Sequence, residues 1–319
     1  MSSRFLNNPW RKRGTDESLP KSQFPSREIW FRTVERSVCP RFLPPAARFA
    51  LALVLAAIAA TAGPRTLRVC ADPNNLPYSN QKGEGFENRI AELIARDLDS
   101  GLEYTWWSEH RSFLRNTLGE GRCDVVIGVP STLDTVTVTQ PYYRSTYVFV
   151  TRQDRNVHPA GLTDPRLAGW RIGIHMVGDD YAPPAAALSA NGAGSNIQGF
   201  SLYGAYGEEN PPARLIEAVA KGEVDVAIAW GPQAGYFAAK ESTPLAIEPV
   251  QPASFRSIPF TFDISMAVRK GNQTLKAELD GALQRHCQEI QAILHRFNIP
   301  QVPKEESNPS CGPSPLSAR

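Results

Sequence analysis

Residues 121–130 read GRCDVVIGVP, and residues 222–230 read GEVDVAIAW. In both stretches a Gly-x-x-Asp turn leads into an apolar run of strand length, as expected for a parallel strand buried on both faces. Glycine suits the left-handed position after a helix, and aspartate can fix the turn that follows. Apolar residues at helical spacing precede each turn, namely Phe113, Leu114 and Leu118 in the first copy and Leu215, Ile216 and Val219 in the second. Such units also recur by coincidence in any α/β fold, but two copies predict two similar lobes.

The chain before the first copy continues the alternation of strands and helices. A strand is expected at residues 67–71, and it ends at the loop 72–78, where two prolines and two asparagines favour a turn. A helix is expected from Gly85, because apolar residues follow at positions 86, 90, 93, 94 and 98. Residues 102–107 favour the next strand. The pattern therefore predicts an α/β protein.

Composition and charge restrict the kinds of partner. The chain has 319 residues, of which 42% are hydrophobic and 21% charged, as in an ordinary globular protein. Its formal net charge is +2, but ten basic and only four acidic residues lie before residue 50. The rest of the chain carries 24 basic and 28 acidic residues and is mildly acidic. This balance argues against nucleic acid as a partner.

The N-terminal region has the pattern of an export signal. An apolar run at residues 49–62 follows Arg41 and Arg48 and ends in a small-x-small cleavage site at residues 60–62. The run is shorter than a typical spanning helix. Residues 1–62 are interpreted as a leader and signal peptide cut after Ala62, with an uncleaved membrane anchor as the alternative. We expect a periplasmic protein without stable membrane insertion after cleavage, and a disordered tail at residues 303–319.

The reactive residues match no catalytic or metal motif. The five histidines lie in no nucleophile motif, and the sequence lacks GxSxG, HExxH and phosphate-loop patterns. No cysteine lies in a CxxC pair, and the histidines are not clustered. We therefore expect no enzyme activity, no metal and no cofactor. His175 is interpreted as a hydrogen-bonded histidine rather than a general base, and nothing in the sequence brings Glu109 and Asp134 together.

The order of these segments resembles bacterial solute-binding proteins of the polar-amino-acid type over roughly residues 65–300. A narrower resemblance is to the quinoprotein-dehydrogenase-associated binding proteins, the J proteins that accompany methanol dehydrogenases using pyrroloquinoline quinone (PQQ). It is carried by the blocks RVCADPNNLPYSN, GFENRIAELIA, GRCDVVIGVP, PYYRSTYVFVTR, GDDYAPP, NPPARLIEAVA, DVAIAWGPQAGYFA and PFTFDISMAVR.

The resemblance implies a type II periplasmic-binding-protein fold, in which two α/β lobes are joined by two crossover strands. Here the crossovers are expected at residues 146–152 and 260–269. Lobe one is expected at residues 65–147 plus 263–300, and lobe two at residues 148–262. The family fold also places the strands next to Cys70 and Cys123 side by side, so an oxidising compartment would allow these cysteines to form a disulfide. Cys70 lies late in its expected strand and Cys123 precedes its own, so the two cysteines could lie too far apart to form a bridge.

The chain departs from the amino-acid binders at both ligand anchors. The loop 130–136 lacks the arginine that would hold a ligand carboxylate, and Trp230 replaces the acidic residue that would hold the ammonium. An amino acid in this site would leave two desolvated charges without partners. Arg144 could take the place of the missing arginine sterically, but it lies at a different position in the sequence pattern of the family.

The ligand- or partner-binding cleft is expected beyond the carboxyl ends of the strands. Most of the residues expected there are aromatic or polar: Asn75, Tyr78, Trp106, Tyr142, Arg144, Asp179, Asp180, Tyr181 and Trp230. The alternative is that several of these aromatic residues only pack the hinge and lobe edges. Trp107, whose side chain should face away from that of Trp106, is the one most expected in the core.

Three functions are compared. In the first, the protein is a non-catalytic periplasmic accessory protein that binds a PQQ-dependent alcohol (methanol) dehydrogenase and supports its maturation or activation, with the cytochrome c of that system as a further candidate partner. In the second, it is the receptor of an ABC transporter for a small uncharged or aromatic ligand. The third, a hydrolase or lyase on this scaffold, is disfavoured because catalytic motifs are absent.

Overall fold

The predicted α/β alternation is present in the computed structural model, which describes residues 65–109, 112–202 and 210–303. The expected leader and signal peptide, and the expected tail beyond residue 303, lie outside the described residues. Within the described residues, no helix combines the length and the apolar content needed to cross a bilayer.

The main feature is an 11-stranded mixed sheet with the strand order β10-β8-β11-β7-β15-β5-β1-β4. Three further strands sit beside this path: β12 pairs with β7, β6 with β15, and β9 with β8. The bounds along the path are β10 (Ile197–Ser201), β8 (Ile172–Val177), β11 (Val226–Trp230), β7 (Tyr143–Arg152), β15 (Thr261–Val268), β5 (Val125–Pro130), β1 (Thr66–Ala71) and β4 (Gly101–Trp106). Beside it lie β12 (Leu245–Pro249), β6 (Thr137–Val138) and β9 (Asp180–Tyr181). Two small hairpins complete the strands: β2 (Asn74–Asn75) with β3 (Ser79–Asn80), and β13 (Ser254–Phe255) with β14 (Ile258–Pro259).

Two long strands connect the halves of this sheet, as the predicted crossovers require. The first residues of β7, Tyr143 to Thr146, pair antiparallel with Thr261 to Ile264 of β15. Further along, β7 pairs with β11 and β12, whereas β15 continues beside β5. By their contacts, the described residues hold together as one unit, so the predicted lobe boundaries stay a prediction.

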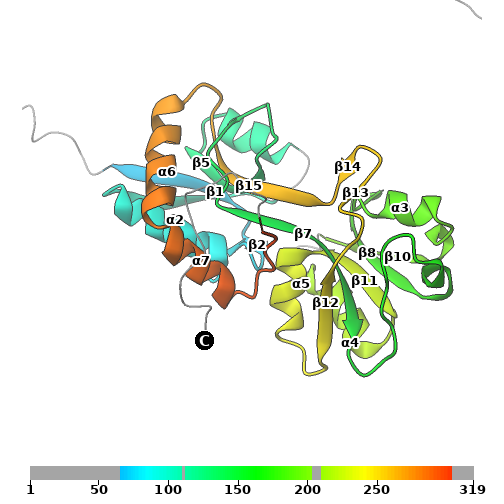
Figure 1. Ribbon diagram of the computed structural model, residues 1–319. Coiled ribbons are helices and arrows are strands. Elements are labelled where there is room, and N and C mark those ends of the chain that lie inside the picture. The colour runs from blue at the N-terminus through cyan, green and yellow to red at the C-terminus, as the bar shows by residue number, and fades with distance from the viewer. Residues whose placement is uncertain (1–64, 110–111, 203–209, 304–319) are drawn as a thin grey trace, which may run out of the picture. The chain divides into compact units, whose positions relative to one another are not determined.

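Each half of the sheet is covered by helices (Figure 1). Against β1, β5 and β15 a large apolar cluster includes residues of α2 (Phe86–Asp97), α6 (Gln273–Arg285) and α7 (Cys287–Arg296). In the other half, α4 (Ala213–Lys221) and α5 (Gly231–Ala238) pack with β7 and β11 in one cluster, and α3 (Ala185–Ala190) lies in another that also includes β8 residues. Short 3₁₀ turns occur at Pro165–Gly169 and Gly194–Asn196.

The two Gly-x-x-Asp turns are built alike. Asp124 accepts hydrogen bonds from the backbone and guanidinium of Arg68, with the shortest N–O distance 2.6 Å. Asp225 accepts the same set from Arg171, with the shortest distance 2.7 Å. Each arginine also donates to a backbone oxygen of its turn, that of Gly121 or Gly222. The aspartates therefore tie each turn to the start of the neighbouring parallel strand.

The segment before the first of these turns differs from the prediction. Residues Arg115–Gly119 form one turn of π-helix rather than an α-helix. The Thr117 hydroxyl donates to the carbonyl of Phe113, 2.6 Å away, and the amide of Arg122 bonds five residues back to Thr117. A threonine hydroxyl that bonds four residues back competes with the α-helical pattern. Phe113 and Leu118 are nevertheless buried together, as their spacing indicated.

A disulfide joins Cys70 and Cys123, whose Cα atoms are 5.5 Å apart. This separation lies within the limit of about 7 Å for bridging without backbone movement. Both cysteines are almost fully buried in the cluster that holds Phe113 and Leu118. The bridge connects β1 to the chain that enters β5.

We predict that the paired change Cys70→Ala/Cys123→Ala lowers the free energy of unfolding by about 2–4 kcal/mol, because the unfolded chain loses a cross-link. Urea denaturation of oxidised protein measures the change, and the same comparison under reducing conditions is the control, since the difference should shrink there. Equal stability of the two oxidised proteins would contradict the prediction.

Candidate functional site

A pocket of about 420 Å³ lies at the ends of several strands. The last residues of β5, β8 and β11, which are Pro130, Val177 and Trp230, all line it. This is the place where ligands bind in open α/β sheets. The other lining residues are Asn75, Tyr78, Glu87, Glu109, Ile127, Gly128, Tyr143, Tyr147, His175, Asp180, Tyr181, Ala182, Pro183, Leu202, Gln233, Phe262 and Ile264.

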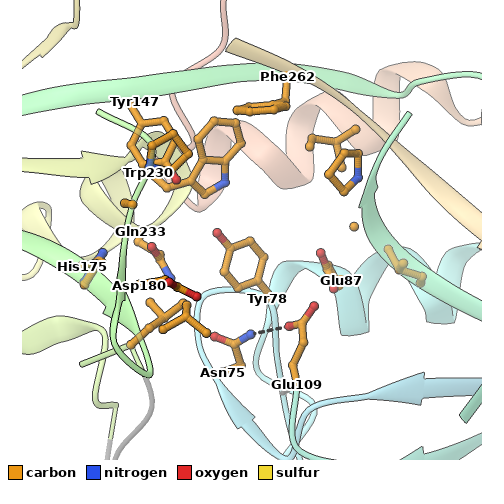
Figure 2. Close-up of a pocket in the computed structure, with 18 of the residues that line it drawn as sticks. Asn75, Tyr78, Glu87, Glu109, Tyr147, His175, Asp180, Trp230, Gln233 and Phe262 are labelled. Atoms are coloured by element: carbon orange, nitrogen blue, oxygen red, sulfur yellow. Dashed lines mark hydrogen bonds between the residues drawn. The ribbon is translucent and has the colours of Figure 1, made fainter. Parts of the chain in front are cut away.

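One wall of the pocket is held by the loop after β1. Asp72 accepts hydrogen bonds from the amides of Asn74 (2.8 Å) and Glu109 (2.6 Å). The side chain of Asn75 donates to Oε2 of Glu109 at 2.9 Å, a contact visible in Figure 2. Burial raises the pKa of Glu109 to about 7, with the nearby Asp72 charge adding to the shift and the Asn75 hydrogen bond opposing it.

The first turn of α2 aims a second carboxylate at the same pocket. The Asn88 side chain accepts hydrogen bonds from the amides of Gly85 and Asn80, both at 3.1 Å, and so holds the loop against the helix. Gly85 is required there, because a Cβ would lie only 1.9 Å from the Tyr78 carbonyl oxygen. Glu87 then faces Gly128, which has a φ of +83° and leaves the room that the carboxylate occupies. Burial, and next the Glu109 charge, hold the Glu87 pKa well above its usual range.

The opposite wall is aromatic. The Trp230 ring lies 5.4 Å from Tyr147 and 5.7 Å from Phe262, measured between centroids. Figure 2 shows Tyr78 between this group and the two glutamates. Tyr78 is supported from behind by Phe86, at 5.4 Å. The pocket thus has a carboxylate wall and an aromatic wall.

His175 lines the pocket as a neutral group. Its Nε2 lies 3.1 Å from the carbonyl oxygen of Pro212, and burial lowers its pKa to about 4. The sequence-based interpretation of His175 as a hydrogen-bonded histidine agrees with this geometry. Among the described residues, no group of three or more His, Cys, Asp or Glu side chains is arranged to hold a metal ion.

Comparison of the chain with known proteins shows its family. Residues 67–298 match the bacterial extracellular solute-binding proteins, family 3. The chain belongs to that family. It is therefore a binding protein rather than an enzyme, and its fold is the type II periplasmic-binding-protein fold that the sequence predicted.

Three similar proteins carry the letter J in their names. Protein MoxJ of Methylorubrum extorquens is 36% identical over 261 residues, which cover 78% of this chain and 85% of MoxJ. The crystal structure of periplasmic binding protein XoxJ from Methylobacterium extorquens AM1 is 34% identical, with a TM-score of 0.62, and covers 75% of this chain and 100% of XoxJ. The crystal structure of MxaJ from Methlophaga aminisulfidivorans MPT is 28% identical, with a TM-score of 0.66, and covers 74% of this chain and 100% of MxaJ.

The pocket contains five of the nine residues that the sequence placed in the cleft. These are Asn75, Tyr78, Asp180, Tyr181 and Trp230. They come from the loop after β1, from β9 and from the end of β11. Their role in binding stays a prediction.

Tyr142 and Arg144 lie elsewhere. Tyr142 is 8% exposed and belongs to the apolar cluster under α2, whereas its neighbour Tyr143 lines the pocket. The rings of Tyr142 and Tyr143 lie 5.1 Å apart between centroids, and both belong to this cluster, so Tyr142 packs next to a lining residue and its role in binding stays a prediction. Arg144 faces Asp263, its register partner on β15, with a closest N–O distance of 3.7 Å.

Trp106 and Asp179 are also outside the pocket. Trp106 stacks on Tyr104 of the same strand, with ring centroids 4.5 Å apart. Asp179 is exposed in the turn between β8 and β9, and the lining residues Val177 and Asp180 flank this turn. Trp107, expected in the core, is 36% exposed and lies under the Arg122 guanidinium, because β4 is an edge strand.

Two glutamates and several other lining residues of the pocket were not predicted from the sequence. The sequence does contain an indication that Glu87 lies near the site, because this acidic residue follows Gly85-Phe86 in the first turn of a helix near the strand ends. The sequence contains no such indication for Glu109, because only the fold brings it to Asn75. Tyr143, Tyr147 and Phe262 also required the register of β7 and β15, and Gln233 required the position of α5.

Glu109 should make stability depend on pH. Its pKa is raised from 4.5 to about 7 in the folded protein, so the folded state binds this proton more tightly. Its contribution to the free energy of unfolding is therefore complete below pH 4.5 and is lost as pH rises through about 7. We predict that Glu109→Gln flattens this fall in urea denaturation across the window. Exposed Glu248→Gln, on β12, is the control and should keep the wild-type slope; an unchanged slope in Glu109→Gln would contradict the assignment.

Common amino acids should not bind tightly. No arginine or lysine of the described residues lines the pocket, so a ligand carboxylate would be buried there without a partner. Calorimetric titration with each amino acid should give no strong heat. A dissociation constant near 1 μM, equivalent to about 8 kcal/mol, would show that an anchor has been overlooked.

Proposed function

We propose that this chain is a periplasmic accessory protein that binds a PQQ-dependent alcohol (methanol) dehydrogenase and supports its maturation or activation. The relatives MoxJ, MxaJ and XoxJ support the proposal, together with the resemblance of many sequence blocks to dehydrogenase-associated binding proteins. Under this proposal the chain is exported by its cleavable signal peptide, and the cytochrome c of the same system is a further candidate partner.

The observation that carries the proposal is the pocket's departure from an amino-acid site. Its described lining has carboxylates and aromatic rings but no arginine or lysine. Trp230 stands at the end of β11, where a ligand-binding relative of the amino-acid type would offer an acidic side chain. A protein that keeps this fold while losing the zwitterion anchors is suited to another occupant.

The rim of this pocket has features that support docking of a partner segment. Tyr181 is 45% exposed, and Trp230 is half-buried at the pocket wall. Pro183 lies on the same rim, and Pro73 and Pro77 stiffen the loop that carries Asn75 and Tyr78. Tyrosine and tryptophan bury large areas at low entropic cost, and proline limits the disorder that a loop loses on binding.

A second candidate function is a transport receptor for a small uncharged or aromatic solute. The pocket volume of about 420 Å³ favours it, because small-molecule sites span about 300–1,000 Å³. A small molecule that stabilises the protein in a thermal-shift screen would support this candidate. Loss of solute uptake with unchanged dehydrogenase activity, after deletion of the gene, would select it over the accessory role.

We predict that Trp230→Ala and Tyr181→Ala each weaken dehydrogenase binding by about 2 kcal/mol or more if the side chain is buried in the contact. Pull-down from periplasm followed by mass spectrometry identifies the partner, and surface-immobilised titration measures the loss. Trp107→Ala is the matched control, because Trp107 is also an exposed aromatic residue but lies outside the pocket. Circular dichroism checks folding, and wild-type binding by both folded test variants would exclude the pocket as the docking site.

A further inference from the structure

Two carboxylates of the pocket have no cation beside them among the described lining residues. Glu87 and Glu109 line it, and no arginine or lysine of the described residues does. His175 does not supply a positive charge, because its pKa is lowered to about 4 by burial. An occupant that carried a negative charge would therefore find no cation to pair with among the described lining residues.

Glu87 is the least satisfied of these groups. Neither a hydrogen bond nor a cation from the described residues reaches its carboxylate, which faces the backbone of Gly128 and the pocket. Burying a carboxylate without a partner is costly. The Asn88 cap and the close approach of Gly85 to Tyr78 fix this helix turn, so the arrangement is built by the fold. A bound cation would supply the missing partner.

No cation–π pair among the described residues involves the aromatic wall. Within the described part of the chain, the cation–π pairs involve Trp107, Trp170, Tyr236 and Phe255, none of which lines the pocket. Trp230, Tyr147 and Phe262 form a contiguous ring group that faces the glutamates across Tyr78. Rings of this kind attract ammonium and guanidinium groups, and tryptophan does so most strongly.

We infer that this pocket binds a protonated amine that has no carboxylate beside it, with Glu87 and Glu109 accepting its N–H groups and Trp230 covering its alkyl chain. The source is either a free alkylamine or the side chain of a lysine in an inserted peptide segment. The lysine source rests on the proposed accessory function, whereas the chemistry of the site does not. A hard metal ion is a poorer fit, since Ca²⁺ takes about six to eight oxygen ligands and the wall opposite the glutamates is aromatic.

The raised pKa values of both glutamates agree with an absent cation. Burial and mutual repulsion favour the protonated form of Glu87, and burial with the Asp72 charge does the same for Glu109. An ammonium group placed between them would favour the ionised forms.

The test is calorimetric titration of the purified exported protein with four probes and no dehydrogenase present. N-acetyl-lysinamide represents the peptide side chain and n-butylamine the free amine. N-acetyl-norleucinamide is the neutral comparator, and lysine is the comparator that carries a carboxylate. We expect at least one amine to bind about tenfold or more tightly than both comparators. Binding of N-acetyl-lysinamide alone identifies the peptide source, and binding of n-butylamine alone identifies the small amine.

Variants locate the site. Glu87→Gln and Glu109→Gln should each weaken amine binding about tenfold or more, whereas exposed Glu248→Gln should leave it unchanged. Trp230→Phe keeps an aromatic ring and should give a smaller loss than Trp230→Leu.

Equal binding of the neutral comparator, insensitivity to both glutamine variants, or tighter binding of Ca²⁺ than of either amine would overturn the inference. So would the absence of any amine binding in a folded protein. Because the dehydrogenase is left out, the accessory function can fail in pull-downs while amine binding stands, and the reverse outcome is equally visible.

Discussion

The carboxylates of Asp124 and Asp225 set the frame on which the pocket depends. Asp124 binds the backbone and guanidinium of Arg68 on β1, and Asp225 binds those of Arg171 directly before β8. Each arginine also reaches the carbonyl of the glycine that opens the turn. The contact fixes where β5 begins relative to β1 and where β11 begins relative to β8. Because strand lengths are similar, fixing the starts also fixes the ends. Pro130, Val177 and Trp230, the last residues of β5, β8 and β11, therefore arrive at one pocket.

The local pattern of the sequence was sufficient to predict this frame. The Gly-x-x-Asp turns, the buried strands after them and the helix after Gly85 follow from residue spacing and turn chemistry alone. The π-helical turn at residues 115–119 was not predictable in the same way, since it arises from one threonine hydroxyl that bonds backwards. Family resemblance, rather than periodicity, supplied the crossovers and the pairing of Cys70 with Cys123.

The lining of the pocket was only partly predictable from the sequence, and the residues that were misplaced or missed share a cause. Tyr142 and Tyr143 are equally aromatic and adjacent, so composition cannot decide which one faces the cavity. Arg144 looks like an anion anchor in the sequence, yet in the structure it faces Asp263 across the two crossover strands. Glu109 reaches the site through Asp72, which precedes it by 37 residues and holds its amide. Each of these depends on strand register or on a distant hydrogen bond, neither of which a single segment reveals.

The passage of β7 and β15 through both halves has a consequence for biosynthesis. The cluster under α2 is completed by β15, α6 and α7, and Ser145 of β7 donates to the carbonyl of Pro300. The first core of the protein therefore contains residues from both ends of the described chain. Contacts of such long sequence separation form slowly. A nascent chain cannot complete this core before its C-terminal helices have been synthesised, so β1, α2 and β5 lack part of their packing until translation is nearly finished.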